Sequence, residues 1–264
     1  MRGVRAMSHD RAMLLRLGRG FRATAAQDRQ HIALAQFDVF LSEQSGDHHS
    51  LAIPISDEGG GIEALVEAFA KQGRPARVEY FHDLYPGLAA ALEGKGFELE
   101  MDAPLMTLEA AGLAPGGRAE GYKRLGPSDG GLMEDFFRRQ SIAFGGDGGD
   151  GSLSWLPQVG SGLERGTVMA ACILCDGQPV TGAVIQGADD AELAGVWTFP
   201  DMRMQGLAFA VCQNLLTDYY LSRGLCWLSS AEDALKLYEK LGFKRVGSQR
   251  NYRRAGREAQ AVGA

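Results

Sequence analysis

The 264-residue sequence has no run of 18 or more apolar residues, and no apolar segment follows its basic first residues as in a secretion signal. It therefore predicts neither a transmembrane helix nor export, and we expect a cytoplasmic protein. A basic excess is also missing, because 27 Lys and Arg stand against 33 Asp and Glu, for a net charge of −6. This balance argues against general binding to nucleic acid or to a membrane surface.

Cysteine is scarce, and the four cysteines do not form a metal-binding pattern. Cys172 and Cys175 have the spacing of a zinc knuckle, but they lie in and next to the apolar run 167–174, which is typical of a strand. An offset of three places the two side chains on opposite faces of a strand. No second Cys-x-x-Cys and no histidine follows, so we expect buried free thiols and no metal ion.

From residue 167 onward the sequence shows a regular series of apolar runs and turn signals. Asp176-Gly177 and Asp189-Asp190 separate three apolar runs, which predicts an antiparallel meander. The predicted strands cover about 167–174, 179–187 and 191–198. Apolar residues at steps of four then predict a helix from about Leu207, followed by a short strand, a helix over 231–241 and a last strand. The order β-β-β-α-β-α-β indicates an α/β fold.

A weaker version of the same pattern precedes residue 110. Gly96-Phe97 and Gly242-Phe243 are 146 residues apart, and the same shift places Pro54 on Pro200 and Gly60 on Gly206 without a gap. We interpret this correspondence as a tandem repeat whose N-terminal copy is degenerate, with a chance match as the alternative.

The repeat divides the chain into four parts. Residues 1–24 are rich in arginine and predict a frayed basic leader, a targeting peptide being the alternative. Residues 25–110 form the first copy, 111–119 have the Gly and Pro content of a linker, and 120–264 form the second copy. Within the second copy, the Gly- and Asp-rich residues 145–151 predict a mobile loop.

The residues that indicate chemistry follow the third strand of the meander. A strand ends near Thr198, a turn containing Arg203 and Gly206 follows, and a helix begins. Such a turn points several backbone N–H groups at one place, where the helix dipole also favours negative charge. Gly206 lets a ligand approach the backbone closely, and Arg203 adds positive charge. The turn therefore predicts a cradle for a pyrophosphate.

This segment resembles the GCN5-related N-acetyltransferase (GNAT) family. The acetyl-CoA signature of the family, Gln/Arg-x-x-Gly-x-Gly/Ala, is matched by Arg203-x-x-Gly206-x-Ala208. A second family segment, Ala-x-x-Leu-Tyr-x-x-x-Gly-Phe, is matched by residues 234–243. The resemblance covers about residues 120–250. It implies the GNAT fold, an α/β arrangement with a mixed, mostly antiparallel central sheet flanked by helices, here in two tandem GNAT-like units.

The resemblance also implies roles for individual residues. The backbone at the end of the family's fourth strand holds the pantetheine arm, and a backbone N–H near Val196 polarises the thioester carbonyl. Tyr238 matches the tyrosine that protonates the departing thiolate, with a packed core tyrosine as the alternative. The residues implied to bind acetyl-CoA are Val196, Trp197, Thr198, Arg203, Met204, Gln205, Gly206, Leu207 and Ala208.

The implied activity is N-acetylation of an amine, on a small molecule or a protein, with acetyl-CoA as co-substrate. The amine attacks the thioester directly in a ternary complex. The alternatives are a non-catalytic acyl-CoA-binding regulatory module and a transferase for another acyl group. Ala231 stands where the family often has Asn, which removes one amide contact to CoA. The sequence identifies neither the acceptor nor the oligomeric state.

The general base is not evident from the sequence. Every histidine lies in the N-terminal half, and Glu192 is a candidate, with a solvated strand-end carboxylate as the alternative. Under the 146-residue shift Asp57 replaces Arg203 and Leu92 replaces Tyr238. We therefore expect the first copy to have a structural or acceptor-shaping role and to lack a second active site.

Overall fold

The computed structural model describes residues 2–43, 49–57, 60–221 and 224–254. The chain divides into two compact units. Unit 1 contains the residues up to Leu105 together with those from Val246 onward, and unit 2 contains Met106–Arg245. Within the described ranges, no helix has the length and apolar character that crossing a membrane requires.

Unit 2 is built on a mixed sheet in the strand order β10-β9-β8-β7-β6. Its strands are β6 (Tyr122–Leu125), β7 (Val168–Cys175), β8 (Gln178–Gln186), β9 (Ala191–Thr198) and β10 (Cys226–Ser229). Strands β6 to β9 pair antiparallel, and β10 pairs parallel with β9. The predicted meander is confirmed, and Asp176 and Gly177 form its first turn with φ of 50° and 78°.

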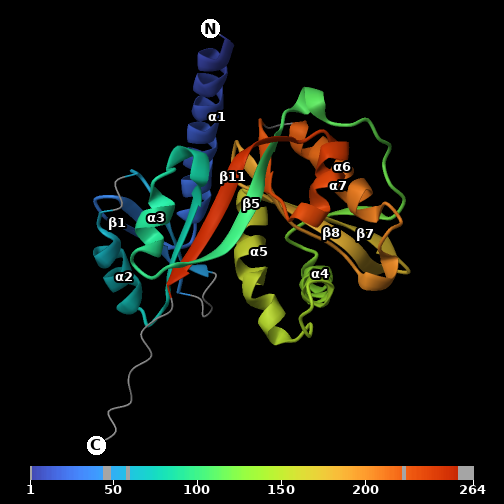
Figure 1. The fold of residues 1–264 in the computed structure, drawn as a ribbon. Helices are drawn as coiled ribbons and strands as arrows, with labels where there is room; N and C mark the ends of the chain where they lie inside the picture. Colours follow the sequence, from blue (N-terminus) through green and yellow to red (C-terminus); the bar gives the residue numbers. More distant parts are fainter. Residues whose placement is uncertain (1, 44–48, 58–59, 222–223, 255–264) are drawn as a thin grey trace, which may run out of the picture. The chain divides into compact units, whose positions relative to one another are not determined.

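Two helices cover each face of this sheet, as Figure 1 shows around β7 and β8. Helices α6 (Leu207–Tyr220) and α7 (Leu235–Leu241) pack on one face around Leu193 and Leu228. Helices α4 (Gly130–Ala143) and α5 (Leu156–Arg165) pack on the other face, with Phe136 against Trp197. Short 3-10 turns lie at Asp150–Trp155, Pro200–Met202 and Glu232–Ala234. The predicted fold class, a mostly antiparallel sheet flanked by helices, is confirmed.

Unit 1 repeats this element order. It contains β1 (Gln30–Ala33), β2 (Phe37–Leu41), β3 (Leu51–Pro54), α2 (Ile62–Ala70), β4 (Ala76–Phe81), α3 (Leu88–Glu93) and the first part of β5 (Glu98–Leu108). The order β1-β2-β3-α2-β4-α3-β5 matches β7-β8-β9-α6-β10-α7-β11, where β11 is Lys244–Arg254. A shift of 146 places the bounds of β5 on those of β11.

The equivalence of Gly60 with Gly206 is wrong by one residue. Helix α2 is preceded by Gly61 in the left-handed conformation (φ 70°), as α6 is preceded by Gly206 (φ 77°). Glycines occupy positions 59–61 in succession, so the sequence alone does not fix which one precedes the helix. The shift of 146 holds again at Gly96 and Gly242, which both have positive φ.

The last strand of each repeat contributes to the unit that contains the other repeat. Met106 and Leu108, at the end of β5, are 1 % and 2 % exposed in the core of unit 2. In unit 1, β11 pairs antiparallel with β4 over six positions and lies between β4 and β5. Tyr252 of β11 is buried in the core of unit 1 and donates a hydrogen bond to Glu93 Oε1 at 2.8 Å. Neither repeat is therefore complete without a strand segment of the other.

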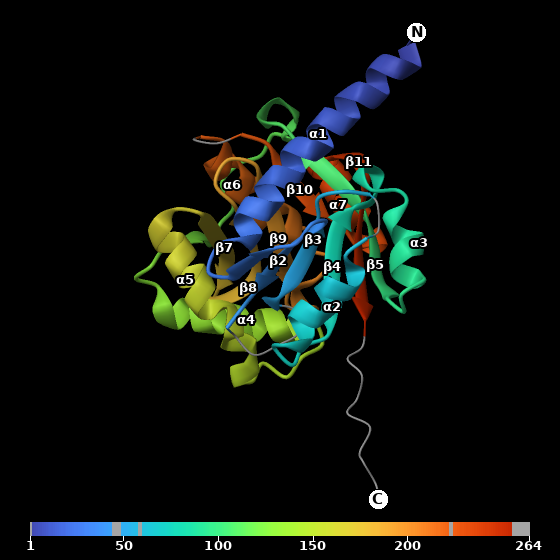
Figure 2. The same cartoon turned by 90° about the vertical axis from the view of Figure 1, so that its left-hand side faces the viewer.

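Of residues 1–24, expected to form a frayed leader, residue 1 lies outside the described residues, and the others belong to helix α1 (Arg2–Ala25). Leu14, Leu17 and Ala25 are buried, and Phe21 stacks on Phe81 with ring centroids 5.7 Å apart. Figure 2 shows α1 running in front of β2 and β3, and Ala25 packs with Phe40, Leu51 and Ile53 of these strands. The apolar residues recur at steps of three and four, which is a helical stripe that the abundant arginines conceal.

We predict that a fragment of residues 120–264 will not unfold cooperatively, whereas residues 106–245 will. The longer N-terminus keeps Met106 and Leu108, which are buried in unit 2. Loss of such a side chain costs about 2–5 kcal/mol, a large part of a domain's stability. Urea unfolding followed by circular dichroism measures the difference. Equal cooperativity in both fragments would show that the predicted boundary at residue 120 encloses a self-sufficient domain.

Candidate functional site

Strand β9 carries a bulge in the middle of its pairing with β8. Thr198 and Trp197 pair with Thr181 and Gly182, but Ala194 pairs with Val184, so β9 has one residue more than β8 across this step. Gly195 lies in the bulge with φ of 57°, a left-handed conformation that side chains disfavour. The bulge bends β9 just before the residues predicted to hold the pantetheine arm.

Beyond its first two residues, β9 separates from its other neighbour. The parallel pairing with β10 joins Ala191 to Cys226 and Glu192 to Trp227, and between these two described strands it ends there. From Leu193 to Thr198 the β10 side of β9 therefore lacks a regular ladder partner. An extended ligand can hydrogen-bond to the backbone of β9 along this edge, in the way that an added strand would.

The turn from β9 to α6, predicted from the sequence to be an anion cradle, contains two residues with positive φ. Met204 and Gly206 have φ of 62° and 77°, and Gly206 is the residue that precedes the helix. No side chain caps this end of α6. A Cβ atom added to Gly206 would meet no heavy atom within 4 Å, so the backbone here is open to a ligand. The first N–H groups of the helix and the positive end of its dipole face this opening.

Arg203 holds the turn in place. Its Nη2 atom donates a hydrogen bond to the carbonyl of Ala143 at the end of α4 (2.7 Å), and its Nε atom donates to the carbonyl of Thr198 (3.3 Å). The guanidinium therefore links the turn to α4 as well as adding charge. Met204 is fully exposed at 101 %, and its left-handed backbone carries strain of about 1–2 kcal/mol. Strain in an exposed turn of this kind is typical of functional sites.

Two threonine hydroxyls lie at the end of β9. Thr181 Oγ1, fully buried, donates to the carbonyl of Trp197 at 2.6 Å and lies 2.9 Å from Thr198 Oγ1. Because the Thr181 proton is engaged, Thr198 donates to Thr181 and keeps its lone pairs available as acceptors. The side chain of Trp197 points to the opposite face and packs edge-to-face on Phe136 at 5.3 Å. Trp197 can therefore contribute its backbone to the site, but not its ring.

Tyr238 lies in α7 and packs in the same core as Val196. It is 8 % exposed and packs edge-to-face against Phe243 at 5.9 Å. No described residue gives its hydroxyl a hydrogen bond. Burial, with smaller contributions from Cys212 and Asp233, raises the pKa of Tyr238 well above its usual value. The phenol therefore keeps its proton at neutral and mildly alkaline pH.

The model of the acetyltransferase (GNAT) family matches residues 135–243. This part of the chain belongs to the GNAT family. The matched segment begins in α4 and ends at Phe243, so it includes the bulge, the turn and Tyr238. At the level of the family, such domains are acyl-CoA-dependent N-acetyltransferases. A search of curated proteins finds no match to the chain.

Solved structures with the same fold cover most of the chain. A GCN5-related N-acetyltransferase from Kribbella flavida aligns over 92 % of this chain and 96 % of its own, with a TM-score of 0.77 and 20 % identity. A second, from Sphaerobacter thermophilus, aligns over 83 % and 77 % with a TM-score of 0.58 and 17 % identity. A tandem GNAT protein from the clavulanic acid biosynthesis pathway aligns over 84 % of this chain and 79 % of its own, with a TM-score of 0.55 and 14 % identity. These likenesses concern the fold.

Glu192, the sequence's candidate base, lies at the start of β9 in the GNAT domain. Its Oε2 atom accepts a hydrogen bond from Gln186 Nε2 at 2.9 Å. Val196 lies four positions further along the chain, which is about 13 Å in a regular strand at roughly 3.3 Å per residue. This distance does not favour Glu192 as the group that receives the amine proton.

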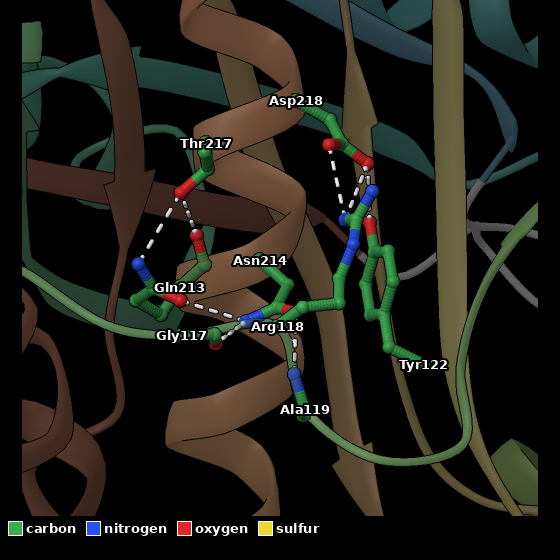
Figure 3. Close-up of polar contacts among 8 residues, drawn as sticks. All are labelled: Gly117, Arg118, Ala119, Tyr122, Gln213, Asn214, Thr217 and Asp218. Carbon is green, nitrogen blue, oxygen red and sulfur yellow. Dashed lines mark hydrogen bonds and ion pairs between the residues drawn. The ribbon is translucent and has the colours of Figure 1, made fainter.

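Residues 111–119, expected to form a linker, are tied to helices of the GNAT domain, and Figure 3 shows the contacts of residues 117–119 with α6. The carboxamide of Asn214 in α6 accepts from Ala119 N at 2.9 Å and donates to the Gly117 carbonyl at 3.0 Å. Arg118 pairs with Asp218 at 3.1 Å, and Ala114 N donates to the Leu241 carbonyl at the end of α7. This segment therefore fixes the two helices that carry the turn and Tyr238.

The sequence missed these contacts because the partners are far apart in the chain. Asn214 lies on the buried face of α6, at 3 % exposure, where the apolar stripe predicts only packing. Tyr122 completes the cluster by donating to Asp218 Oδ2 at 2.9 Å. A buried amide and a partly buried carboxylate in an apolar helix are the signal that indicates such a partner.

Unit 1 fills its equivalent turn with its own side chains. A Cβ atom on Gly61, the counterpart of Gly206, would lie 3.9 Å from the Gln36 carboxamide, and one on the adjacent Gly60 would lie 2.8 Å from it. Asp57 Oδ1 accepts a hydrogen bond from Gly87 N at 3.0 Å. Arg22 of α1 donates to the Pro54 carbonyl at the end of β3. The turn of unit 1 is thus lined by its own side chains, and its sequence between Pro54 and Gly61 contains no basic residue.

The described residues contain no group of three or more His, Cys, Asp or Glu side chains that could hold a metal ion. Cys172 is buried, whereas Cys175 is exposed, which corrects the expectation that both thiols are buried. Residues 145–151, expected to form a mobile loop, make defined contacts, since Arg138 donates to the Gly148 carbonyl at 2.9 Å and pairs with Asp150.

We predict that titration will give one acetyl-CoA site per chain and that Gly206→Val will abolish it. A β-branched residue at φ of 77° is strained, and its side chain would occupy the opening over the helix end. Gly206→Asn is the matched control for the backbone, because Asn tolerates the left-handed conformation. Calorimetry should show binding lost in the Val variant and weakened about tenfold or less in the Asn variant. Two sites in the wild type, or unchanged affinity in the Val variant, would contradict this reading of the turn.

Proposed function

We propose that the GNAT domain transfers an acetyl group from acetyl-CoA to an amine by direct attack in a ternary complex. The observation that carries the proposal is the separation of β9 from β10 after Glu192, beside a bulge in β9. From the end of β9 the chain runs through residues 199–206 to the uncapped helix end at Gly206. A molecule with a peptide-like arm and a pyrophosphate fits this sequence of groups, and acetyl-CoA has both.

In this proposal the turn holds the pyrophosphate. The backbone of Met204, Gln205, Gly206, Leu207 and Ala208 supplies N–H donors at the positive end of α6. Arg203 keeps the turn against α4 and leaves its charge near the phosphates. Val196, Trp197 and Thr198 hold the pantetheine arm through their backbone, and Thr198 Oγ1 accepts from one of its amides.

Acceleration then comes from positioning and from two polar groups. Holding the amine against the thioester makes the reaction effectively unimolecular, which supplies much of the rate enhancement. The Val196 N–H stabilises the oxyanion that forms when the amine attacks, and one such donor contributes about 10²–10³-fold. When the C–S bond breaks, Tyr238 gives its proton to the thiolate of CoA. The amine's own proton leaves through water.

The N-terminal repeat has a structural or acceptor-shaping role in this proposal, because its turn is filled by Gln36 and its position equivalent to Tyr238 is Leu92, which is fully buried. The runner-up function is non-catalytic binding of acyl-CoA. Two features favour this non-catalytic role. Ala231 lacks the amide that often contacts CoA in the family, and no general base has been identified.

We predict that acetyl-CoA will release its thiol in the presence of at least one class of amine. The full-length chain is incubated with acetyl-CoA and a panel of small-molecule amines, aminoglycosides and N-terminal or lysine peptides, and free thiol is measured with a chromogenic reagent. Propionyl- and succinyl-CoA in parallel test the acyl group. Tight acetyl-CoA binding without release for any amine would favour the non-catalytic module.

We predict that Tyr238→Phe will lower kcat about 10²–10⁴-fold with little change in acetyl-CoA affinity, because only the proton donor is removed. Tyr220→Phe is the matched control, since Tyr220 donates to the Leu108 carbonyl at 2.5 Å and has a structural role. The control should lose stability and keep its turnover. Because burial raises the pKa of Tyr238, its protonated form and the turnover that depends on it should persist as the pH rises from 7 to 9. If the chemical step is rate-limiting and Tyr238→Phe keeps the wild-type kcat, then Tyr238 has only a packing role.

A further inference from the structure

A polar side chain interrupts the buried stripe of α4. Met133, Phe136 and Ala143 are buried on the face that packs against β8 and β9, at spacings of three and seven. Gln140 falls between Phe136 and Ala143 on this stripe, four residues after the first and three before the second. Gln140 is only partly buried, so its carboxamide lies at the edge of this stripe, where a hydrogen bond to the protein can fix its orientation.

The partner of Gln140 is the bulge of β9. Its Nε2 atom donates to the Gly195 carbonyl at 2.8 Å. A Cβ atom on Gly195 would lie 2.7 Å from this same nitrogen, so a side chain at position 195 would displace the carboxamide from its present place. The left-handed φ of Gly195 and its lack of a side chain both fit the contact with Gln140.

The contact determines the orientation of one peptide group. The Gly195 carbonyl and the Val196 N–H belong to the same peptide plane, and in a trans peptide they point in opposite directions. No cis peptide occurs in the described chain. Helix α4 lies on one face of the sheet, while Val196 packs on the other face, in the core that contains Tyr238. Holding the carbonyl toward α4 therefore turns the Val196 N–H toward the side of Tyr238.

We propose that Gln140 is a positioning residue for acyl transfer: by holding the Gly195 carbonyl, it directs the Val196 N–H at the thioester oxygen. This inference rests on the proposed function. Gln140 touches neither acetyl-CoA nor the amine, and it acts through the peptide group between Gly195 and Val196. Its loss should change the rate of the chemical step more than the binding of acetyl-CoA.

The test compares two substitutions of Gln140 with a control on the same helix. Gln140→Met keeps the length of the side chain and removes the donor, and Gln140→Glu places a negative oxygen against the Gly195 carbonyl. Arg138→Gln removes the contacts to Gly148 and Asp150 without touching β9. Circular dichroism and thermal unfolding check each fold. If the Glu variant fails to fold, the Met variant carries the test.

We expect kcat to fall about 10-fold in Gln140→Met and about 100-fold in Gln140→Glu, since a misplaced oxyanion donor loses most of its effect. The KM for acetyl-CoA should stay within about threefold, and Arg138→Gln should keep its kcat within about twofold. Unchanged kcat in both Gln140 variants, a loss confined to KM, or an equal loss in Arg138→Gln would overturn the inference.

A second readout does not depend on turnover. In the wild type, the backbone amide resonance of Val196 should shift on addition of acetyl-CoA and much less on addition of CoA, because only the thioester carbonyl accepts this N–H. The shift should disappear in Gln140→Met. If no amine is acetylated but this pattern is seen, the proposed function fails and the positioning role of Gln140 stands. A wild-type Val196 amide that responds equally to both ligands, or to neither, overturns the inference whether or not the chain is an enzyme.

Discussion

The candidate site depends on one backbone irregularity, the extra residue at Gly195 in β9. A regular strand would pair with β8 along its whole length and would keep each peptide group within the sheet. The bulge breaks that regularity, and the carboxamide of Gln140 compensates the displaced carbonyl with a hydrogen bond of 2.8 Å. On the other side, β9 leaves β10 after two residue pairs. The bulge on the β8 side of β9 and the separation from β10 on its other side interrupt the sheet at this point. The core remains intact, because Leu193 and Trp197 are buried on opposite faces.

A second constraint fixes the helices around this opening. The segment from Ala114 to Tyr122 contacts α6 through Asn214 and Asp218, and contacts the end of α7 through Leu241. Arg203 connects the turn to α4 in a similar way. The turn at Gly206 and Tyr238 therefore lie on elements that partly buried hydrogen bonds hold in place, a support that functional sites require for precise geometry.

Much of this arrangement could be predicted from local patterns, and the part that could not depends on distant partners. The meander over residues 167–198 and the turn at Gly206 follow from alternation and glycine placement, which are properties of short windows. The repeat was visible at Gly96 and Gly242 because left-handed backbone requires glycine there. In contrast, the role of Gln140 depends on a residue 55 positions away. Helix α1 was missed because its arginines concealed the stripe of Leu14, Leu17 and Phe21. The individual acetyl-CoA contacts and the domain boundaries stay predictions.

The shared last strands also affect how the chain is made. Unit 1 needs Val246 to Arg254 beside β4, and the whole of unit 2 is synthesised between these two segments. The edge of β4 therefore emerges from the ribosome long before its partner strand exists. An unpaired edge is a site for wrong pairing, and contacts between residues far apart in sequence form slowly. Unit 1 therefore receives its last strand only after all of unit 2 has been synthesised, although its other strands lie at the start of the chain.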